Sequence, residues 1–386
     1  MKILHTSDWH LGHTLYGYDR SEEQNEMLRQ IEELVGEERP DALVVSGDIF
    51  HTGQPSAAVQ TLFTDAVMRM HAASPDTVIV ITAGNHDSAS RHEITRILWQ
   101  TQQVHMIGTV DKERLVSQVV DIQGKGYVVA IPYLNERSIP EGFWQSLSDG
   151  IGNTAGLPLV LSAHLTVNGS DFSGHEDARD RTVGGIDAIE LEALGTGFDY
   201  VALGHIHRPQ TLRGSDGRVR YCGTPVPVSF DECFPHTVSV VEIAAHGAKP
   251  VIREIPVSNP RPLVSLPTEG FASWEKVQEL AKNFPKDNPA YIRLRVEVED
   301  ILPPDAQAMA RSLFAEGNAR FCYLQTQRKA KPSAAPETLS VSEFRAMDPL
   351  DVARLFAGDT GMTFDDKLEG LFREAAAAAR EDHRNQ

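Results

Sequence analysis

The chain has 386 residues, of which 41% are hydrophobic and 23% are charged, and this composition is typical of a soluble globular protein with two or three domains. Its formal net charge of −18 argues against a broad basic face that grips a polyanion. A nucleic-acid substrate stays open, because an acidic site changes its local sign once it binds divalent cations.

Membrane and secreted classes are also disfavoured. We find no run of about 18 apolar residues that would span a bilayer. The N-terminal stretch MKILHTSDWH has too few apolar residues for a signal peptide. We therefore expect a cytoplasmic protein without a membrane segment.

The first 257 residues alternate short apolar segments with amphipathic ones, which predicts an α/β domain. Ser21 and Gln24 form a capping box that opens a first helix, and Gly36 offers its end. A second helix opens at Pro55. Six segments are predicted strands buried on both faces, and two later ones are predicted antiparallel strands: 2–5, 42–46, 78–82, 127–131, 159–162 and 200–203, then 236–243 and 250–257.

The rest of the chain divides into smaller parts. Three prolines at 258–270 predict a linker, and a module with the order α-β-α-β follows at 274–284, 291–299, 304–314 and 319–327. The strand at 291–299 alternates apolar and charged residues, which predicts a half-exposed strand. A second linker at 328–337 precedes a tail with two helical stretches. We divide the chain into domains at 1–257, 258–335 and 336–386, and we expect the last to dock on a partner.

Polar side chains follow five of the predicted strands, at the point where each strand ends. In an open α/β sheet such positions converge on one edge, outside the carboxyl ends of the strands. Any one of them is explained by a turn or a cap, but turns alone do not explain five such groups in order. The residues are Asp8 and His10, then Asp48 and His51, then Asn85, His86 and Asp87, then His164, and finally His205 and His207.

The chemistry of this set indicates a metal site. Carboxylate, amide and imidazole groups without a thiolate favour Mn²⁺, Fe or Zn²⁺ over a closed structural zinc site. Seven ligands drawn from this set are too many for one transition ion with an open position. They suit two ions about 3.5–4 Å apart that share a bridging carboxylate and act on a phosphoryl group.

The motifs DxH, GD, GNHD, a single His and GHxH, in this order, resemble the calcineurin-like metallophosphoesterase superfamily. The resemblance implies a β-sandwich flanked by helices. It also implies a proton-donating or transition-state-stabilising His86 oriented by Asp87. The implied ligand sets are Asp8, His10 and His207 for one ion, Asn85, His164 and His205 for the other, and Asp48 as the bridge.

Details of the motifs favour a diesterase. Purple acid phosphatases carry a tyrosine at the position of His51, and the protein phosphatases carry arginines that this chain lacks in GDIFHTG and GNHDS. A phosphodiester carries one negative charge and needs less cationic clamping than a monoester.

The stretches ILHTSDWHLG, LVVSGDIFHTGQPS, ITAGNHDS, VALGHIHRPQ and YCGTPVPVSFDE resemble the SbcD family of bacterial nuclease subunits. The resemblance implies Mn²⁺-dependent cleavage of DNA, with 3′→5′ exonuclease activity on duplex ends and endonuclease activity on hairpins or single strands. It implies a small α+β capping domain and a C-terminal helical segment that docks on the SbcC ATPase. It also implies a homodimer through a four-helix contact of the nuclease domain, and a complex of two copies of each subunit on the nucleoid.

The roles of several residues have two possible interpretations at this point. His51 matches an active-site histidine of archaeal and eukaryotic relatives, and the alternative is an ordinary loop histidine. Arg179 and Arg181, in a long polar loop, are candidate phosphate contacts or solvated surface. We interpret three further residues, His13, His175 and His236, as surface histidines. The competing functions are a small-molecule phosphomonoesterase or cyclic-nucleotide phosphodiesterase, and a non-catalytic scaffold with a vestigial metal site.

Overall fold

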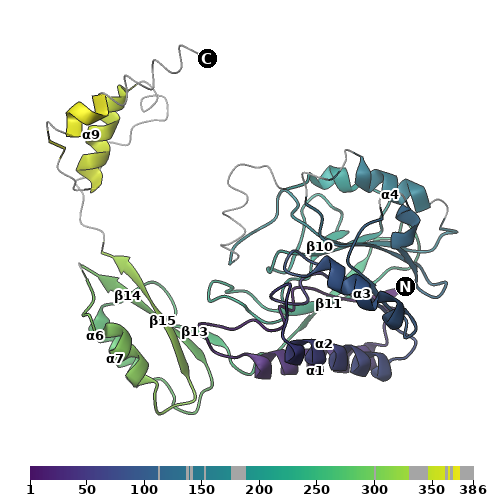
Figure 1. Ribbon diagram of the computed structural model, residues 1–386, viewed down its shortest axis with the longest axis horizontal. Coiled ribbons are helices and arrows are strands. Elements are labelled where there is room, and N and C mark those ends of the chain that lie inside the picture. Colours follow the sequence, from purple (N-terminus) through teal and green to yellow (C-terminus); the bar gives the residue numbers. More distant parts are fainter. Residues whose placement is uncertain are drawn as a thin grey trace. The chain divides into compact units, whose positions relative to one another are not determined.

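The computed structural model describes residues 1–111, 114–135, 139, 142–151, 154–174, 188–299, 301–329, 347–360, 364–365 and 368–373. The chain divides into two compact units, Met1–Arg328 and Lys329–Gln386 (Figure 1). The first unit includes the small module that we assigned to a separate domain, and the boundaries at 257 and 335 stay predictions. Within the described residues, no helix has the length and apolar character that a membrane span requires.

The first sheet of the larger unit has six strands in the order β12-β11-β1-β2-β3-β4. The four strands from β1 to β4 are parallel, and β11 and β12 continue the sheet in antiparallel fashion, as predicted. The strands are β1 (Lys2–Thr6), β2 (Ala42–Ser46), β3 (Val78–Thr82), β4 (Val104–Ile107), β11 (Thr237–Glu242) and β12 (Val251–Pro256).

A second six-stranded sheet faces the first, in the order β5-β6-β7-β8-β10-β9. A layer of buried side chains, among them Ile3, Val44 and Val128, joins the two sheets into a sandwich, which confirms the fold class. Our expectation of one sheet edge was wrong, since β7 and β8 lie in the second sheet. Its strands are β5 (Val119–Asp121), β6 (Tyr127–Ile131), β7 (Leu159–His164), β8 (Tyr200–Gly204), β9 (Gln210–Thr211) and β10 (Val219–Tyr221).

Helices cover the outer faces of the sandwich (Figure 1). The helices α1 (Ser21–Glu38) and α2 (Ala57–Ala73) pack their apolar faces on the first sheet. The helix α4 (Phe143–Ile151) packs on the second sheet together with the short helix η3 (Leu191–Leu194). The remaining helices of the sandwich that the structure describes are η1 (Leu115–Gln118) and α3 (Ala89–Gln100). The apolar stripes of α1 and α2 therefore bury themselves against a sheet, as the periodicity predicts, whereas α3 keeps Ile94, Ile97 and Leu98 exposed.

The predicted start of α1 was wrong by one residue and its predicted end by three. Arg20 is the N-cap, and Ser21 instead donates from its backbone nitrogen and its hydroxyl to the Asp19 carboxylate. Gly36 lies inside the helix, which ends only at Arg39 in the left-handed conformation with φ 43°. A nearby carboxylate outside the helix therefore replaces the expected capping box.

The small module is a three-stranded parallel sheet with the order β13-β14-β15. Its first strand lies inside the segment that we predicted to be a linker, because the prolines flank the strand and do not interrupt it. The predicted half-exposed strand is mostly buried, and even Arg293 is fully buried. The elements are β13 (Leu263–Leu266), α6 (Trp274–Lys282), β14 (Tyr291–Val298), α7 (Ala306–Leu313) and β15 (Arg320–Arg328).

In the second unit, the described residues form the helix α9 (Pro349–Thr360) and a helical stretch at 368–373. Arg354 of the helix and Glu369 of the stretch form an ion pair of 2.7 Å. Both stretches agree with the predicted helical tail, and most of the predicted second linker lies outside the described residues.

Candidate metal centre

The ends of β1, β2 and β3 from one sheet and of β7 and β8 from the other meet at one edge of the sandwich. The sheets approach closely there, because a Cβ on Gly204 would overlap the Ser46 carbonyl oxygen of the opposite sheet. Four predicted ligands have left-handed backbones that side chains normally avoid, which is typical of strained functional sites. They are Asp8 (φ 53°), His10 (φ 44°), Asp48 (φ 51°) and His205 (φ 95°).

One group of possible ligands consists of Asp8, His10 and His207, all buried. The Nε2 atoms of His10 and His207 lie 3.2 Å apart. The Nδ1 atom of His207 pairs with Glu232 Oε1 at 2.9 Å. In the tautomer that donates from Nδ1 to this carboxylate, Nε2 carries the lone pair with which an imidazole binds a metal.

A second group gathers around the side-chain oxygen of Asn85. This oxygen lies 3.0 Å from His164 Nε2 and 3.0 Å from His205 Nδ1. His164 Nδ1 donates to the Ser46 carbonyl at 2.8 Å, so Nε2 is the ring atom that faces Asn85.

The carboxylate of Asp48 lies between the two groups. Its Oδ2 atom is 3.4 Å from His164 Nε2 and 3.9 Å from His10 Nε2. Its Oδ1 atom accepts a hydrogen bond of 2.9 Å from the His86 backbone nitrogen. Asp48 is thus placed as a bridge would be.

Burial and the close charges shift the pKa values of this cluster. Burial raises the pKa of Asp8 to about 7 and lowers the pKa of His10 to about 3. Burial also disfavours charge on His164, but the carboxylates of Asp48 and Asp8 outweigh it and raise the pKa of His164 to about 9. Burial likewise opposes the ionisation of Asp48, but His164 holds its pKa below the ordinary range.

The donor set fits divalent metal ions. Without a metal, the raised pKa of His164 keeps a proton on Nε2, which faces the oxygens of Asn85 and Asp48. A divalent cation among these three atoms would take the place of that proton. Oxygen and imidazole nitrogen ligands suit Mn²⁺, Fe or Zn²⁺.

Two further histidines lie at the open side of this cluster. The ring of His86 is 5.0 Å from the ring of His10 and stacks on His51 at 5.6 Å between centroids. The Nδ1 atom of His86 pairs with the His51 carbonyl oxygen at 2.9 Å. His86 is therefore anchored at one nitrogen, which leaves its Nε2 for a substrate.

The expected contact between Asp87 and His86 is not present. The Asp87 carboxylate instead accepts hydrogen bonds from the backbone nitrogens of Ile49, Phe50 and Gly84, at 3.1, 2.9 and 2.8 Å. The Asp87 carboxylate takes this position because the buried backbone amides of the turn need a hydrogen-bond acceptor. Asp87 thus ties the loop that carries Asp48 to the loop that carries Asn85.

Sequence reasoning missed one buried acid and misplaced two histidines. Glu232 lies within the stretch YCGTPVPVSFDE, but a lone acid without a spaced partner gives no signal. His13 is half-buried, with its ring 4.6 Å from His51, and burial lowers its pKa to about 2. His236 is also half-buried and pairs with the Thr224 carbonyl at 2.8 Å. The remaining predicted residues, Arg179, Arg181 and His175, lie outside the described part of the chain.

Comparisons with known proteins agree with this geometry. Residues 1–209 match the family described as calcineurin-like phosphoesterase. The chain is similar to three proteins named as the SbcD subunit of nuclease SbcCD. The one from Rhodobacter capsulatus is 36% identical and the match covers 72% of this chain and 74% of that protein. The one from Bacillus subtilis is 29% identical, and the match covers 78% of this chain and 80% of that protein. The one from Escherichia coli is 27% identical, and the match covers 82% of this chain and 84% of that protein.

Proposed function

This chain belongs to the calcineurin-like phosphoesterase family and within it to the SbcD family, and from that premise we propose that it is a metal-dependent DNA nuclease. The observation that carries the proposal is the convergence of two ligand groups around Asp48 at one edge of the sandwich. The fold implies a dinuclear metal site, and we propose Mn²⁺ as its ion. Relatives named as SbcCD subunits support a nuclease over a small-molecule phosphatase or an inactive scaffold.

The two groups would hold one ion each. Asp8, His10 and His207 would bind the first ion, and Asp48 would bridge both. Asn85, His164 and His205 would bind the second. When bound, such a pair supplies an activated water and stabilises the charge that develops on the phosphodiester.

The residues of the chain itself position the substrate and move the proton. His86 donates from Nδ1 to the His51 carbonyl and presents Nε2 toward the open side, and in its doubly protonated form it donates a proton or a hydrogen bond from Nε2 to the phosphate oxygens. His51 stacks on His86 and holds its orientation through the backbone carbonyl. Arg179 and Arg181 are proposed phosphate contacts of the adjoining polar loop.

We also propose the partners and the location of the protein. The tail docks on the SbcC ATPase, and its exposed Phe356 and Leu371 support a docking role. The net charge of −18 fits a nuclease subunit whose ATPase partner supplies most of the DNA affinity. The small module positions DNA at the site, and the complex of two copies of each subunit works in the cytoplasm on the nucleoid.

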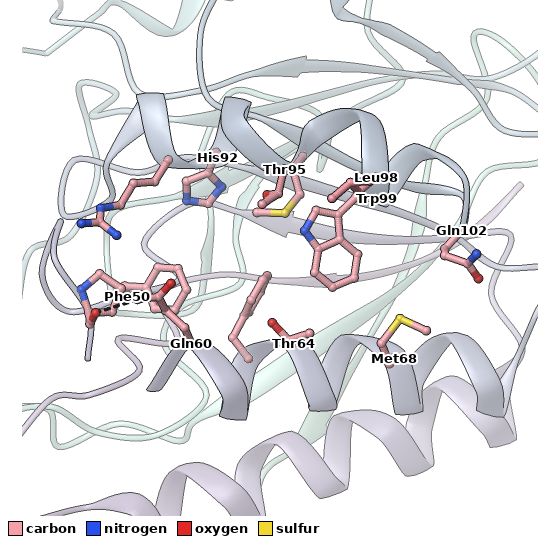
Figure 2. A pocket seen from close by; sticks show the side chains of 13 residues that line it. Phe50, Gln60, Thr64, Met68, His92, Thr95, Leu98, Trp99 and Gln102 are labelled. Atoms are coloured by element: carbon pink, nitrogen blue, oxygen red, sulfur yellow. Dashed lines mark hydrogen bonds between the residues drawn. The ribbon is translucent and has the colours of Figure 1, made fainter. Parts of the chain in front are cut away.

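A homodimer through the nuclease domain is supported by α3. Its side chains Ile94, Ile97 and Leu98 are 78%, 79% and 71% exposed. Beside them lies an apolar cavity of about 390 Å³ between α2 and α3, lined among others by Trp99 and Met68 (Figure 2). An exposed apolar patch of this kind is typical of a protein interface. The substitution Ile97→Glu should convert a dimer into a monomer in light scattering, and an unchanged mass would contradict the proposed contact.

One assay tests the nuclease proposal. The purified chain is incubated with Mn²⁺ and a 3′-labelled duplex, a DNA hairpin or a small phosphomonoester, and the same is done with Asp48→Ala. We expect Mn²⁺-dependent cleavage of DNA that the substitution abolishes. Hydrolysis of the small ester alone would favour the phosphatase, and a lack of both activities, also with SbcC present, would favour the scaffold.

A further inference from the structure

The small sheet contacts two loops that lead to the same half of the metal centre. One is the loop after β1, which carries His10. The other, at 222–236, holds the ring of His207 through Glu232. Leu15 of the first loop and Phe230 of the second are buried in one apolar cluster with Tyr291 of β14. The small sheet is therefore packed against the supports of both histidines.

Aromatic contacts fasten the first loop. The ring of Tyr16 stacks on Tyr323 of β15, with centroids 4.6 Å apart and planes 20° apart. The hydroxyl of Tyr18 donates to the Phe321 carbonyl of the same strand at 3.0 Å. These contacts begin a few residues after His10.

A buried arginine fastens the second loop. Arg293 of β14 is fully buried and donates from Nη1 to Asp231 Oδ1 at 2.5 Å and from Nη2 to the Phe230 carbonyl at 3.0 Å. Its Nε atom donates to Ser265 Oγ of β13 at 2.9 Å. With the hydroxyl of Tyr323 at 3.2 Å from Nη1, the guanidinium serves four partners. A planar group that serves several partners in fixed directions holds a backbone more rigidly than an ammonium group does.

The residue after Asp231 contacts the metal centre. Glu232 is buried, accepts from His207 Nδ1 with Oε1, and accepts from the Val228 backbone nitrogen with Oε2 at 3.2 Å. The series of contacts thus runs from Arg293 through Phe230 and Asp231 to Glu232 and then to the ring of His207. Carboxylate partners of metal-binding histidines commonly change metal affinity about 10–100-fold when they are removed.

We propose that Arg293 and Glu232 are positioning residues through which the small sheet sets the affinity of one ion, the one held by Asp8, His10 and His207. In the second group, Asn85 and His164 lie on other loops, and His205, which precedes His207 on the same loop, directs its Nδ1 to the Asn85 oxygen at 3.0 Å, so this group should depend little on the contact. The inference rests on the proposed metal centre, and it makes the small module a determinant of metal occupancy in addition to its proposed role on DNA.

The test is a calorimetric titration of the full chain with Mn²⁺. The wild-type isotherm should show two bound ions. His207→Ala removes a ligand of the first ion, so the isotherm of this variant shows which binding step belongs to the first ion and which to the second. We expect Arg293→Met and Glu232→Gln each to weaken the first ion by roughly 10-fold or more and to leave the other within about twofold. The double variant should lose little more than either single one, because both act through one series of contacts.

Arg295→Met is the matched control. Arg295 lies on the same strand and donates to the Thr268 carbonyl within the small module, so both ions should bind as in the wild type. Thermal melting of every variant shows whether it folds, and Tyr323→Phe is a milder variant that removes one acceptor of Arg293 and should weaken only the first ion. Unchanged affinities in Arg293→Met, or equal weakening of both ions in Tyr323→Phe, would overturn the proposal. A wild type that binds two ions but cleaves no DNA would refute the nuclease and leave this inference intact.

Discussion

The Nε2 atoms of His10 and His207 face each other at 3.2 Å, although 197 positions separate the two residues in the chain. His10 follows the first strand of one sheet and His207 follows a strand of the other. Their meeting depends on the face-to-face packing of the two sheets, and the same packing places Asp48 near His164. Four consequences can be measured.

The first prediction concerns His86. It lies beside the ligand groups, and within the described part of the chain it hydrogen bonds through Nδ1 to His51 and through its backbone to Asp48. His86→Asn should therefore bind Mn²⁺ with unchanged stoichiometry while DNA cleavage falls about 10²–10⁴-fold, the usual contribution of a general acid. Calorimetry measures the Mn²⁺ stoichiometry, and an assay on the same preparation measures the rate of DNA cleavage. Loss of a bound ion in this variant would make His86 a ligand and contradict the assignment.

The second prediction concerns Asp87, whose buried carboxylate accepts three backbone hydrogen bonds. Asp87→Ala should lower the free energy of unfolding by roughly 3 kcal/mol, because amides at the turn lose a charged acceptor. Urea denaturation measures this value, with the exposed Asp76→Ala as the control, which should change it by less than about 0.5 kcal/mol. An unchanged stability together with a lower cleavage rate would restore the role first expected from the sequence, the orientation of His86.

The third prediction concerns the close approach of the sheets at Gly204. A Cβ there would overlap the Ser46 carbonyl oxygen, which is backbone and cannot move aside. Gly204→Ala should cost about 3 kcal/mol of stability or more and weaken metal binding. Gly150→Ala is the control, because its Cβ would meet open space, and it should stabilise the helix by about 0.5–1 kcal/mol. Equal stability of the two variants would show that the sheets do not meet so closely.

The fourth prediction concerns pH in the absence of metal. The pKa of His164 is raised from 6.5 to about 9, so its contribution to stability is complete below pH 6.5 and is lost as pH rises toward 9. The EDTA-treated chain should therefore become less stable from about pH 6.5 toward pH 9, measured as the urea midpoint. In His164→Gln this decline should shrink. A midpoint that rises over this range in the wild type would refute the charge assignment.

The sequence by itself determined the longer buried strands of the sandwich, the polar residues that end them and the chemistry of the proposed ligands, whereas the short strands β4, β5, β9 and β10 were not predicted. Short apolar runs and the residues directly after them are local features, so the ends of β2 and β3 and the position of Asp48 follow from pattern alone. The antiparallel strands β11 and β12 were predicted for the same reason.

Only the tertiary structure decided which of these residues meet. The division into two sheets, the strand β13 within a proline-rich segment and the buried Arg293 all depend on pairing across long stretches of chain, which no local period records. The hydrogen bonds of Asp87 and the contact of Glu232 with His207 depend in turn on that packing. A buried polar group takes the partner that the fold brings within reach, and the sequence does not name that partner.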